Sequence, residues 1–428
     1  MEQRFLIPAG EPLKMASYGH HTPLNRSGVT LEEKEGGYAV RMERPRGSCG
    51  RWHFVYDLAP EVTACHCRVR HNGSKENCAK GLILGWMSWL DADGRNIETC
   101  YLEAEGSGVL SRAMPRPEGA VQLMIGASLR YCSDEVIFRD IVCTPVTLKE
   151  RKVRIVVAKI TPAQGGSATC EDNQARMESV FKQLEQAGEK PDLIVFPETL
   201  LTRWVRDLGP EMGAQPIPGP HTDWAANWAK RLNTNVVVSL REKDNGVFYN
   251  SAAVIDRSGR IVGVYHKSQL CIGEYECGYD WGTELPVFEL DFGKIGVLIC
   301  WDMWFPEAVR TLRLRGAEII AYPIAATSRK HFDWMWRVRA MENGVVLAAA
   351  ISGGDSCPSR VISATGELLA ESYTPQTYAA ATVDLRDPKM FLRYLSVDSG
   401  AGETRTFYTH ERHPELYRSL SDLEDKQQ

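Results

Sequence analysis

The pattern of apolar residues changes near residue 150 of this 428-residue chain. Over residues 30–145, short stretches of alternating apolar and polar residues are separated by turn-forming residues, with no convincing amphipathic helix between them. Short strands at this spacing are typical of an all-β sandwich. Beyond residue 150, continuous apolar strands alternate with segments of helical periodicity, which is typical of an α/β layered domain. The sequence therefore predicts two domains of different class.

The domain boundaries follow these changes in pattern. We expect a β-sandwich accessory domain over residues 1–150 and an α/β domain over residues 151–386. Residues 387–428 are more polar, and we expect this C-terminal extension to pack on the surface or on a partner subunit. The length of 428 residues fits two or three domains.

Charge and hydropathy limit the kinds of partner. The formal net charge of -5 gives no reason to expect binding to nucleic acid or to an anionic membrane. Apolar runs such as Gly344 to Ile351 are much shorter than the ~18 residues that a membrane-spanning helix needs. The first residues of the chain lack the apolar region of a signal peptide, so we expect a cytoplasmic protein.

The twelve cysteines are spaced irregularly, which argues against a disulfide framework. In a reducing cytosol they are expected to be free thiols. One local group could bind a metal by its residue types: Cys65, His66, Cys67, His71 and Cys78. However, Cys65 and Cys67 alternate with His66 along an expected strand, so His66 points to the opposite face. Thiols buried in a sheet are the favoured interpretation, and no metal site is predicted.

Three tryptophans in the first domain raise the hypothesis of weak sugar binding: Trp52, Trp86 and Trp89. Trp86 and Trp89 lie in a strongly apolar run from Leu82 to Leu90. Core packing is the commoner fate of tryptophan in such a run. Sugar binding is therefore a secondary hypothesis.

Three apolar strands of the α/β domain each end at a reactive side chain. One strand leads through Pro197 to Glu198, a second leads to Lys267, and a third delivers Cys300 just before an expected helix. In open α/β sheets, functional sites gather at the carboxyl ends of strands. Taken singly, these residues read as a solvated carboxylate, an exposed lysine and a small buried thiol. Taken together, they make chemical sense as one site.

A thiol becomes a good nucleophile only when it is deprotonated. A nearby carboxylate can take the proton, and an ammonium can stabilise the thiolate and then the oxyanion of a tetrahedral intermediate. The backbone N–H of Trp301 is a natural second oxyanion donor, and the loss of one such donor costs ~10²–10³ in turnover. We therefore predict that Glu198, Lys267 and Cys300 are catalytic.

From about Val153 to Leu420 the chain resembles the nitrilase superfamily of carbon–nitrogen hydrolases. The resemblance is carried by Phe196-Pro197-Glu198, Tyr265-His266-Lys267 and Ile299-Cys300-Trp301-Asp302. Further segments agree: Asn250-Ser251-Ala252, Gly293-Lys294-Ile295-Gly296, Arg339-Ala340-Met341-Glu342-Asn343 and His413-Pro414-Glu415-Leu416-Tyr417. The resemblance implies a four-layer α-β-β-α fold, a Glu–Lys–Cys triad, and no metal or organic cofactor. Most members lack the sandwich before residue 150, whose rhythm resembles the jelly-roll modules often attached to hydrolases.

The family usually has a second glutamate between the lysine and the cysteine. The candidates here are Glu274 and Glu276. Glu274 is preferred because of its spacing along the sequence from Gly278 and Gly282. The resemblance implies that this residue orients the lysine and the substrate amide.

The segment from Cys300 to Glu307 resembles amidases and N-carbamoyl-amine hydrolases, and the N-carbamoylputrescine type above all. True nitrilases usually place a glutamate where Asp302 stands. We therefore favour hydrolysis of a small linear amide or N-carbamoyl compound, with nitrile hydrolysis as the alternative. The loop from Gly353 to Ser359 departs from the family pattern and weakens inference about the substrate. A third hypothesis, from another class, is a carbohydrate- or ligand-binding protein with an inactive hydrolase domain.

The resemblance and the composition also suggest a homodimer or a higher homo-oligomer. The expected helix from Pro306 to Leu314 is more apolar than one buried face requires. The C-terminal extension adds Phe391, Leu392, Tyr394 and Leu395, with no domain of its own to bury them. Because apolar groups gain ~25 cal/mol per Å² on leaving water, a shared interface is a plausible destination. The alternative is that the extension packs on its own subunit.

Overall fold

The computed structural model describes residues 13–16, 29–43, 49–164, 168–203, 205, 213–325, 332–354, 356–387, 393–396 and 400–420. The chain divides into two compact units, one of residues 1–149 with 392–428 and one of residues 150–391. No helix in these described ranges is long and apolar enough to cross a membrane.

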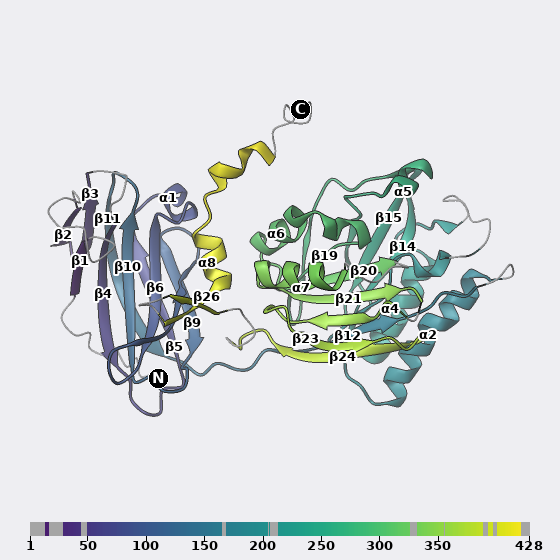
Figure 1. Cartoon of the computed structure of the whole chain (residues 1–428), viewed down its shortest axis with the longest axis horizontal. Coiled ribbons are helices and arrows are strands. Elements are labelled where there is room, and N and C mark those ends of the chain that lie inside the picture. Colours follow the sequence, from purple (N-terminus) through teal and green to yellow (C-terminus); the bar gives the residue numbers. More distant parts are fainter. Residues whose placement is uncertain are drawn as a thin grey trace. The chain divides into compact units, whose positions relative to one another are not determined.

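The first unit is a sandwich of two β-sheets (Figure 1). One sheet has the order β1-β4-β10-β6-β7-β26-β25, and the other has the order β2-β3-β11-β5-β9-β8. The strands are β1 (Leu13–Ala16), β2 (Val29–Lys34), β3 (Gly37–Met42), β4 (Cys49–Asp57), β5 (Ala64–His71), β6 (Ile83–Leu90), β7 (Asn96–Tyr101), β8 (Glu103–Ala104), β9 (Val109–Pro115), β10 (Gln122–Arg130), β11 (Glu135–Pro145), β25 (Arg393–Ser396) and β26 (Gly400–Glu403). A short helix, α1 (Lys75–Ala79), is capped at its N-terminus by Ser74. The prediction of a β-rich sandwich is confirmed.

The apolar face of each sheet supplies the sandwich core. Trp52 is fully buried, and its indole N–H donates to the carbonyl of Ala39 at 3.0 Å. Trp89 is also buried, and Trp86 is 8% exposed. The rings therefore offer little free surface on which a sugar could stack. Cys65 and Cys67 are buried as well, and no group of three or more metal-ligating residues in the described part of the chain could hold a metal ion.

The C-terminal segment adds strands to this sandwich. β26 pairs with β7 in parallel, with Ala401 opposite Glu98, and β25 pairs with β26. The following helix, α8 (Thr404–His410), places Phe407 against the ring of Tyr101 at 4.8 Å. A short 3-10 segment, η5 (Pro414–Leu420), follows. The sequence pattern did not predict this pairing; Phe391 and Leu392 lie outside the described residues.

The second unit contains two further sheets. One has the order β16-β15-β14-β13-β12-β24, with β17 pairing to β15, and the other has the order β18-β19-β20-β21-β22-β23. The strands of the first are β12 (Lys152–Lys159), β13 (Leu193–Val195), β14 (Asn235–Asp244), β15 (Val247–Ile255), β16 (Ile261–His266), β17 (Tyr279–Asp280) and β24 (Thr377–Asp384). The strands of the second are β18 (Val287–Leu290), β19 (Gly293–Val297), β20 (Ile319–Ala325), β21 (Val346–Ser352), β22 (Ser359–Ile362) and β23 (Leu368–Ser372).

Helices cover the outer face of each sheet. The helical segments are α2 (Cys170–Gln186), η2 (Leu200–Thr202), α4 (Pro220–Leu232), α5 (Ile272–Glu276), η3 (Cys300–Trp304), α6 (Pro306–Leu314) and α7 (Phe332–Asn343). α2 and α4 pack on the first sheet through residues such as Phe181 and Trp228. α6 and α7 pack on the second through Leu312 and Trp336. The predicted four-layer α-β-β-α order is confirmed.

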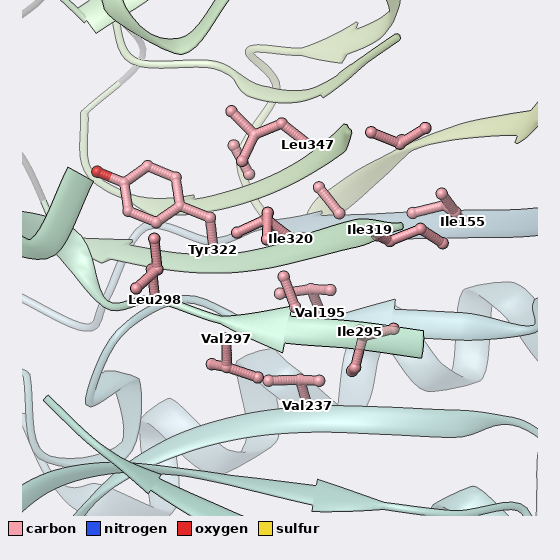
Figure 2. Packing of buried hydrophobic residues seen from close by; sticks show 14 of the residues in the cluster. Ile155, Val195, Val237, Ile295, Val297, Leu298, Ile319, Ile320, Tyr322 and Leu347 are labelled. Carbon is pink, nitrogen blue, oxygen red and sulfur yellow. The ribbon is translucent and has the colours of Figure 1, made fainter. Parts of the chain in front are cut away.

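The two sheets of this unit face each other across an apolar core. Ile155, Val195 and Val237 come from the first sheet, and residues such as Val297 and Ile320 come from the second (Figure 2). Neighbours along β12 point the opposite way, so that Val156 packs under the helices. The central strands are buried on both faces, which explains their continuous apolar sequences.

One expectation about α6 is wrong. Ala308, Val309 and Leu312 are all buried in the core of their own unit, and only Leu314, at 40% exposed, lies toward solvent. The apolar residues of α6 therefore serve one buried face, and they do not by themselves call for a partner subunit.

Candidate active site

Glu198 stands just beyond the end of β13. Pairing with β14 continues past β13, because the N–H of Phe196 donates to the carbonyl of Val237 at 3.0 Å. Thr199 then has a φ of 40°, in the left-handed region, and its N–H donates to Ser239 Oγ at 3.1 Å. This sharp turn after a buried strand keeps Glu198 inside the fold, where the residue is only 4% exposed.

Lys267 follows the last residue of β16. Its backbone N–H donates to the carbonyl of Asn250 on β15 at 2.8 Å, which extends the strand pairing to the lysine itself. The ammonium is 2.9 Å from Glu198 Oε1 and 2.9 Å from Glu274 Oε2. Because the residue is only 2% exposed, the ammonium depends on these carboxylates to offset its lost hydration.

The second carboxylate at this lysine belongs to Glu274, on the short helix α5. Its Oε2 also accepts from the backbone N–H of Cys271 at 2.9 Å, which ties the side chain to the start of its own helix. Glu276 is exposed, two residues further on. The geometry thus brings Glu274, and not Glu276, against Lys267.

Cys300 opens η3, directly after the apolar strand that contains Ile295 and Val297. Its φ of 45° lies in the left-handed region, a conformation that costs energy for a residue with a side chain and that recurs at functional sites. The Tyr322 hydroxyl donates to the Cys300 carbonyl at 2.6 Å, and the Cys300 thiol lies 3.7 Å from the carbonyl of Ala325. These contacts fix the turn that presents the sulfur.

The charges of the site act on one another. Burial raises the pKa of the Cys300 thiol, the Glu198 carboxylate raises it further, and Lys267 opposes both. Burial alone would lower the pKa of Lys267, but Glu198, Cys300 and Glu274 raise it, so the ammonium stays charged. Burial also opposes the charge on Glu274, but Lys267 and Asn250 lower the pKa of this carboxyl below its usual range. The resting arrangement is therefore a protonated thiol beside a charged lysine with its carboxylates.

Asp302 connects the cysteine turn to the lysine segment. Its carboxylate accepts from the Ile299 N–H at 2.8 Å and the Tyr265 hydroxyl at 2.7 Å. It also accepts from the Gln269 N–H at 2.8 Å and the Ser268 hydroxyl at 3.2 Å. Ile299 precedes the cysteine, and the other three donors flank Lys267 in sequence. Asp302 therefore holds the two segments together.

Asn250 is a residue to which the sequence assigned no role beyond a family-like segment. Its Nδ2 donates to Glu198 Oε1 at 2.8 Å and to Glu274 Oε1 at 2.7 Å. It lies on β15 opposite Arg241 of β14. The only signal in the sequence was the Asn250-Ser251-Ala252 segment, since an asparagine on a strand carries no mark of its partners.

The surface beside the nucleophile is aromatic. Trp301 is 38% exposed, and its ring centroid lies 5.4 Å from that of Trp304. Phe305 is also exposed, and its ring centroid lies 6.5 Å from that of Trp301. The Trp301 side chain therefore lies partly in solvent, while its backbone follows the cysteine as the sequence requires.

The loop after β21 is held from the opposite sheet. The buried Lys159, at the end of β12, donates to the carbonyls of Gly353 and Gly354 at 2.7 and 3.2 Å. Thr161 Oγ1 donates to the Gly353 carbonyl at 2.9 Å. This part of the chain departs from the family pattern, and Asp355 lies outside the described residues.

Fold and site together define a carbon–nitrogen hydrolase of the nitrilase type, and comparison with known proteins agrees. The Carbon-nitrogen hydrolase family model matches residues 155–388, so the chain belongs to this family. A probable nitrilase from Schizosaccharomyces pombe is 28% identical over 61% of this chain and 98% of its own length. A nitrilase from Pyrococcus abyssi is 34% identical over 50% of this chain and 84% of its own. An N-carbamoylputrescine amidase from Solanum lycopersicum is 42% identical, over 28% of this chain and 42% of its own.

Solved structures share the fold. A carbon-nitrogen hydrolase from Helicobacter pylori superposes with a TM-score of 0.51 at 23% identity, covering 63% of this chain and 98% of its own. An amidase from Nesterenkonia sp. gives a TM-score of 0.51 at 20% identity, covering 64% and 98%. The nitrilase-like fold is therefore established for this chain.

Proposed function

We propose that this protein hydrolyses a non-peptide carbon–nitrogen bond of a small linear amide or an N-carbamoyl compound through a thioester on Cys300. The observation that carries the proposal is the shared contact of Lys267 with Glu198 and Glu274, about 3 Å each, beside a strained cysteine turn. A buried charge cluster of this kind is costly to build and is typical of an active site.

In the first half of the reaction, Glu198 takes the proton of the Cys300 thiol as the sulfur attacks the carbonyl carbon. The oxyanion that forms is stabilised by the Lys267 ammonium and by the backbone N–H of Trp301. Glu198 then gives its proton to the departing nitrogen. The carbon–nitrogen bond breaks, ammonia or an amine leaves, and a thioester remains on Cys300.

In the second half, Glu198 takes a proton from a water molecule, and the oxygen of the water attacks the thioester. The second tetrahedral intermediate collapses, the carbon–sulfur bond breaks, and the proton returns to the sulfur. Glu274 orients Lys267 and the substrate amide throughout. Every proton is returned, so the residues described here suffice for the cycle without a cofactor.

The choice of an amide or carbamoyl group is supported by two observations. Asp302 stands where true nitrilases usually have glutamate. The residue is 0% exposed, and its carboxylate accepts hydrogen bonds from four donors. N-carbamoylputrescine amidases are among the relatives. Nitrile hydrolysis is the second candidate, because nitrilases match a larger share of the chain.

A screen for ammonia release from linear amides, N-carbamoyl amines and nitriles tests the proposal. We expect turnover of at least one amide or carbamoyl compound by the wild-type protein and none by Cys300→Ala. Turnover of nitriles alone would favour the second candidate. No release from any of the three classes would favour a binding protein with an inactive hydrolase domain.

We also propose that the protein is a homodimer. The exposed aromatic cluster of Trp301, Trp304 and Phe305, and the exposed Trp334 on α7, are better candidates for a symmetric contact than the buried face of α6. Light scattering at micromolar concentration would give about twice the chain mass of 47.9 kDa for a dimer. Trp334→Glu, at a residue 74% exposed, should shift the mass toward the monomer. A mass near 48 kDa for the wild type would contradict the proposal.

A further inference from the structure

Asn250 occupies a position in the site that the Glu–Lys–Cys set does not explain. Its backbone carbonyl accepts from the N–H of Lys267 at 2.8 Å, and its side-chain nitrogen donates to Glu198 and Glu274 at 2.8 and 2.7 Å. One residue thus contacts the base, the lysine and the second glutamate. It is 3% exposed, so solvent does not compete for these bonds.

The orientation of the Asn250 amide follows from chemistry. An asparagine can be placed either way round, but a carbonyl oxygen facing two carboxylate oxygens would meet acceptors only. The nitrogen must therefore face the glutamates, and each of its two N–H groups serves one of them. Its Oδ1 is buried with no hydrogen-bond partner among the described residues. The carboxylate contacts thus determine how this side chain lies.

Asn250 and Lys267 share the same two acceptor atoms. Glu198 Oε1 and Glu274 Oε1 each accept from the lysine, at 2.9 and 3.0 Å, and from the asparagine. Two carboxylates are thereby held against one ammonium, with the Asn250 amide as a neutral donor between them. Four polar atoms close a ring, in which moving either donor would leave a buried carboxylate short of a hydrogen bond.

This arrangement divides the work of the donors and acceptors. The ammonium has three N–H groups and spends two of them on the glutamates, which leaves one for an oxyanion. Glu198 has Oε1 committed to two donors, which leaves its other oxygen to take the thiol proton. Without Asn250, each Oε1 atom would lose one of its hydrogen-bond donors, and the two glutamates would repel each other more strongly across Lys267.

We propose that Asn250 is a positioning residue that fixes Oε1 of Glu198 and Oε1 of Glu274 at one lysine and so reserves the other oxygen of Glu198 for the Cys300 proton. This inference rests on the proposed function of the site. Asn250 touches no reacting atom in it and acts through the two glutamates.

Other titratable and charged groups also bear on this cluster. They come from each neighbouring element: Glu198 after β13, Arg241 on β14, Lys267 after β16, Glu274 on α5, Tyr279 on β17 and Cys300 on η3. Lys267 and the Asn250 amide both lower the pKa of Glu274, and burial opposes them. Removal of the amide should therefore raise the pH at which Glu274 takes up a proton.

The decisive variants are Asn250→Ala, Asn250→Ser and Asn250→Asp. In Asn250→Ala we expect kcat to fall about 10²-fold with KM nearly unchanged, as for the loss of a preorganised donor. The acidic limb of the pH profile of kcat/KM should move up by about one pH unit. Asn250→Asp, which replaces the donor with a third carboxylate of the same size, should show the larger shift.

A matched control is Ser251→Ala. Ser251 is the next residue on β15 and is fully buried, but its hydroxyl donates to Glu242 at 2.6 Å and to no carboxylate of the site. Its removal costs a comparable buried hydrogen bond, so stability should fall while the acidic limb stays where it is. A circular dichroism melt of each variant separates loss of fold from loss of positioning, and Asn250→Ser keeps the test open if the alanine variant does not fold.

A second readout needs no substrate. The rate of Cys300 alkylation by iodoacetamide is followed against pH by peptide mass spectrometry, because Cys271 and Cys277 are also exposed and must be counted apart. We expect the acidic limb of alkylation at Cys300 to shift in the Asn250 variants and not in Ser251→Ala. Unshifted limbs in folded Asn250 variants would overturn the inference. A wild type that alkylates as expected but hydrolyses nothing would sink the proposed function and leave the positioning role standing.

Discussion

Two buried carboxylates of the site, Asp302 and Glu274, behave in opposite ways. The four donors to Asp302 among the described residues are neutral, and burial raises the pKa of this carboxyl to about 6. Glu274 is also largely buried, yet Lys267 brings its pKa below the usual range. Burial opposes charge at both residues, and the ammonium decides the outcome at Glu274. The hydrogen bonds of Asp302 fix backbone segments, and Glu274 with Lys267 holds charges inside the site. We refer to Asp302 with its donors as the neutral-donor centre, and to Glu274 with Lys267 as the charged centre.

Cys300 lies beside both centres, so its substitution should have the largest effect on turnover. We expect Cys300→Ala and Cys300→Ser to lower kcat by at least about 10⁴-fold, because no other residue of the site can form the thioester. The fold should persist, since Tyr322 and Asp302 bind the backbone of this turn and not the sulfur. Steady-state ammonia release and a thermal melt check both points. Wild-type-like activity in either variant would refute the assignment of the nucleophile.

The charged centre should be the more sensitive of the two to neutralisation. Glu274→Gln removes one of two carboxylates at Lys267 and should lower kcat by about 10²–10³-fold. Glu276→Gln, two residues along on the exposed side of α5, is the matched control and should cost less than about threefold. Single-turnover kinetics on both variants provide the measurement, and the reverse ranking would transfer the role to Glu276.

The neutral-donor centre should change how the free energy of unfolding depends on pH. The pKa of Asp302 is raised from 3.8 to about 6, so the folded protein holds this proton more tightly than the unfolded chain does. The contribution is fully present below about pH 4 and is lost as the pH rises to about 6, a change on the order of 3 kcal/mol. Asp302→Asn does not titrate. The free energy of unfolding of Asp302→Asn, measured with urea, should therefore fall below that of the wild type by less at pH 7 than at pH 4.

Glu274→Gln should show the opposite slope. Because the pKa of Glu274 is lowered, its stabilising contribution is present above about pH 4.5 and is lost as the pH falls. The free energy of unfolding of Glu274→Gln should therefore fall below that of the wild type by more at pH 7 than at pH 4. Equal slopes for the two variants would remove the contrast between the centres.

Chelation should have the smallest effect. The proposed chemistry uses a thiol, two carboxylates and an ammonium, so prolonged dialysis against EDTA should leave kcat within about twofold of the untreated value. The matched control is addition of zinc to the dialysed protein. A large loss of activity restored by zinc would show that a metal takes part.

Much of the fold could be predicted from pattern alone. β13 is buried along its whole length and β19 is buried from Ile295 to Val297, and the apolar runs that contain these residues marked them in the sequence. The start of α2 at Cys170 is set by the capping box that Thr169 and Asp172 form. The contribution of β26 to the sandwich could not be predicted, since it pairs with a strand about 300 residues earlier.

The sequence by itself marked the candidate reactive groups. Glu198, Lys267 and Cys300 each follow an apolar strand, and this local pattern singled them out. Glu198 and Lys267 follow strands of one sheet and Cys300 follows a strand of the other, so their proximity depends on how the two sheets pack. The order of the motifs along the chain also carries the resemblance to the nitrilase superfamily.

Only the tertiary structure decided which further groups contact these candidate residues. Glu274 and Glu276 are both plausible in the sequence, and the turn of α5 toward Lys267 separates them. Asn250 bonds residues 52 and 24 positions away, and Asp302 bonds residues from 3 to 37 positions away. A hydrogen bond depends on distance and direction within a few tenths of an ångström, and the linear sequence specifies neither until the strands are packed.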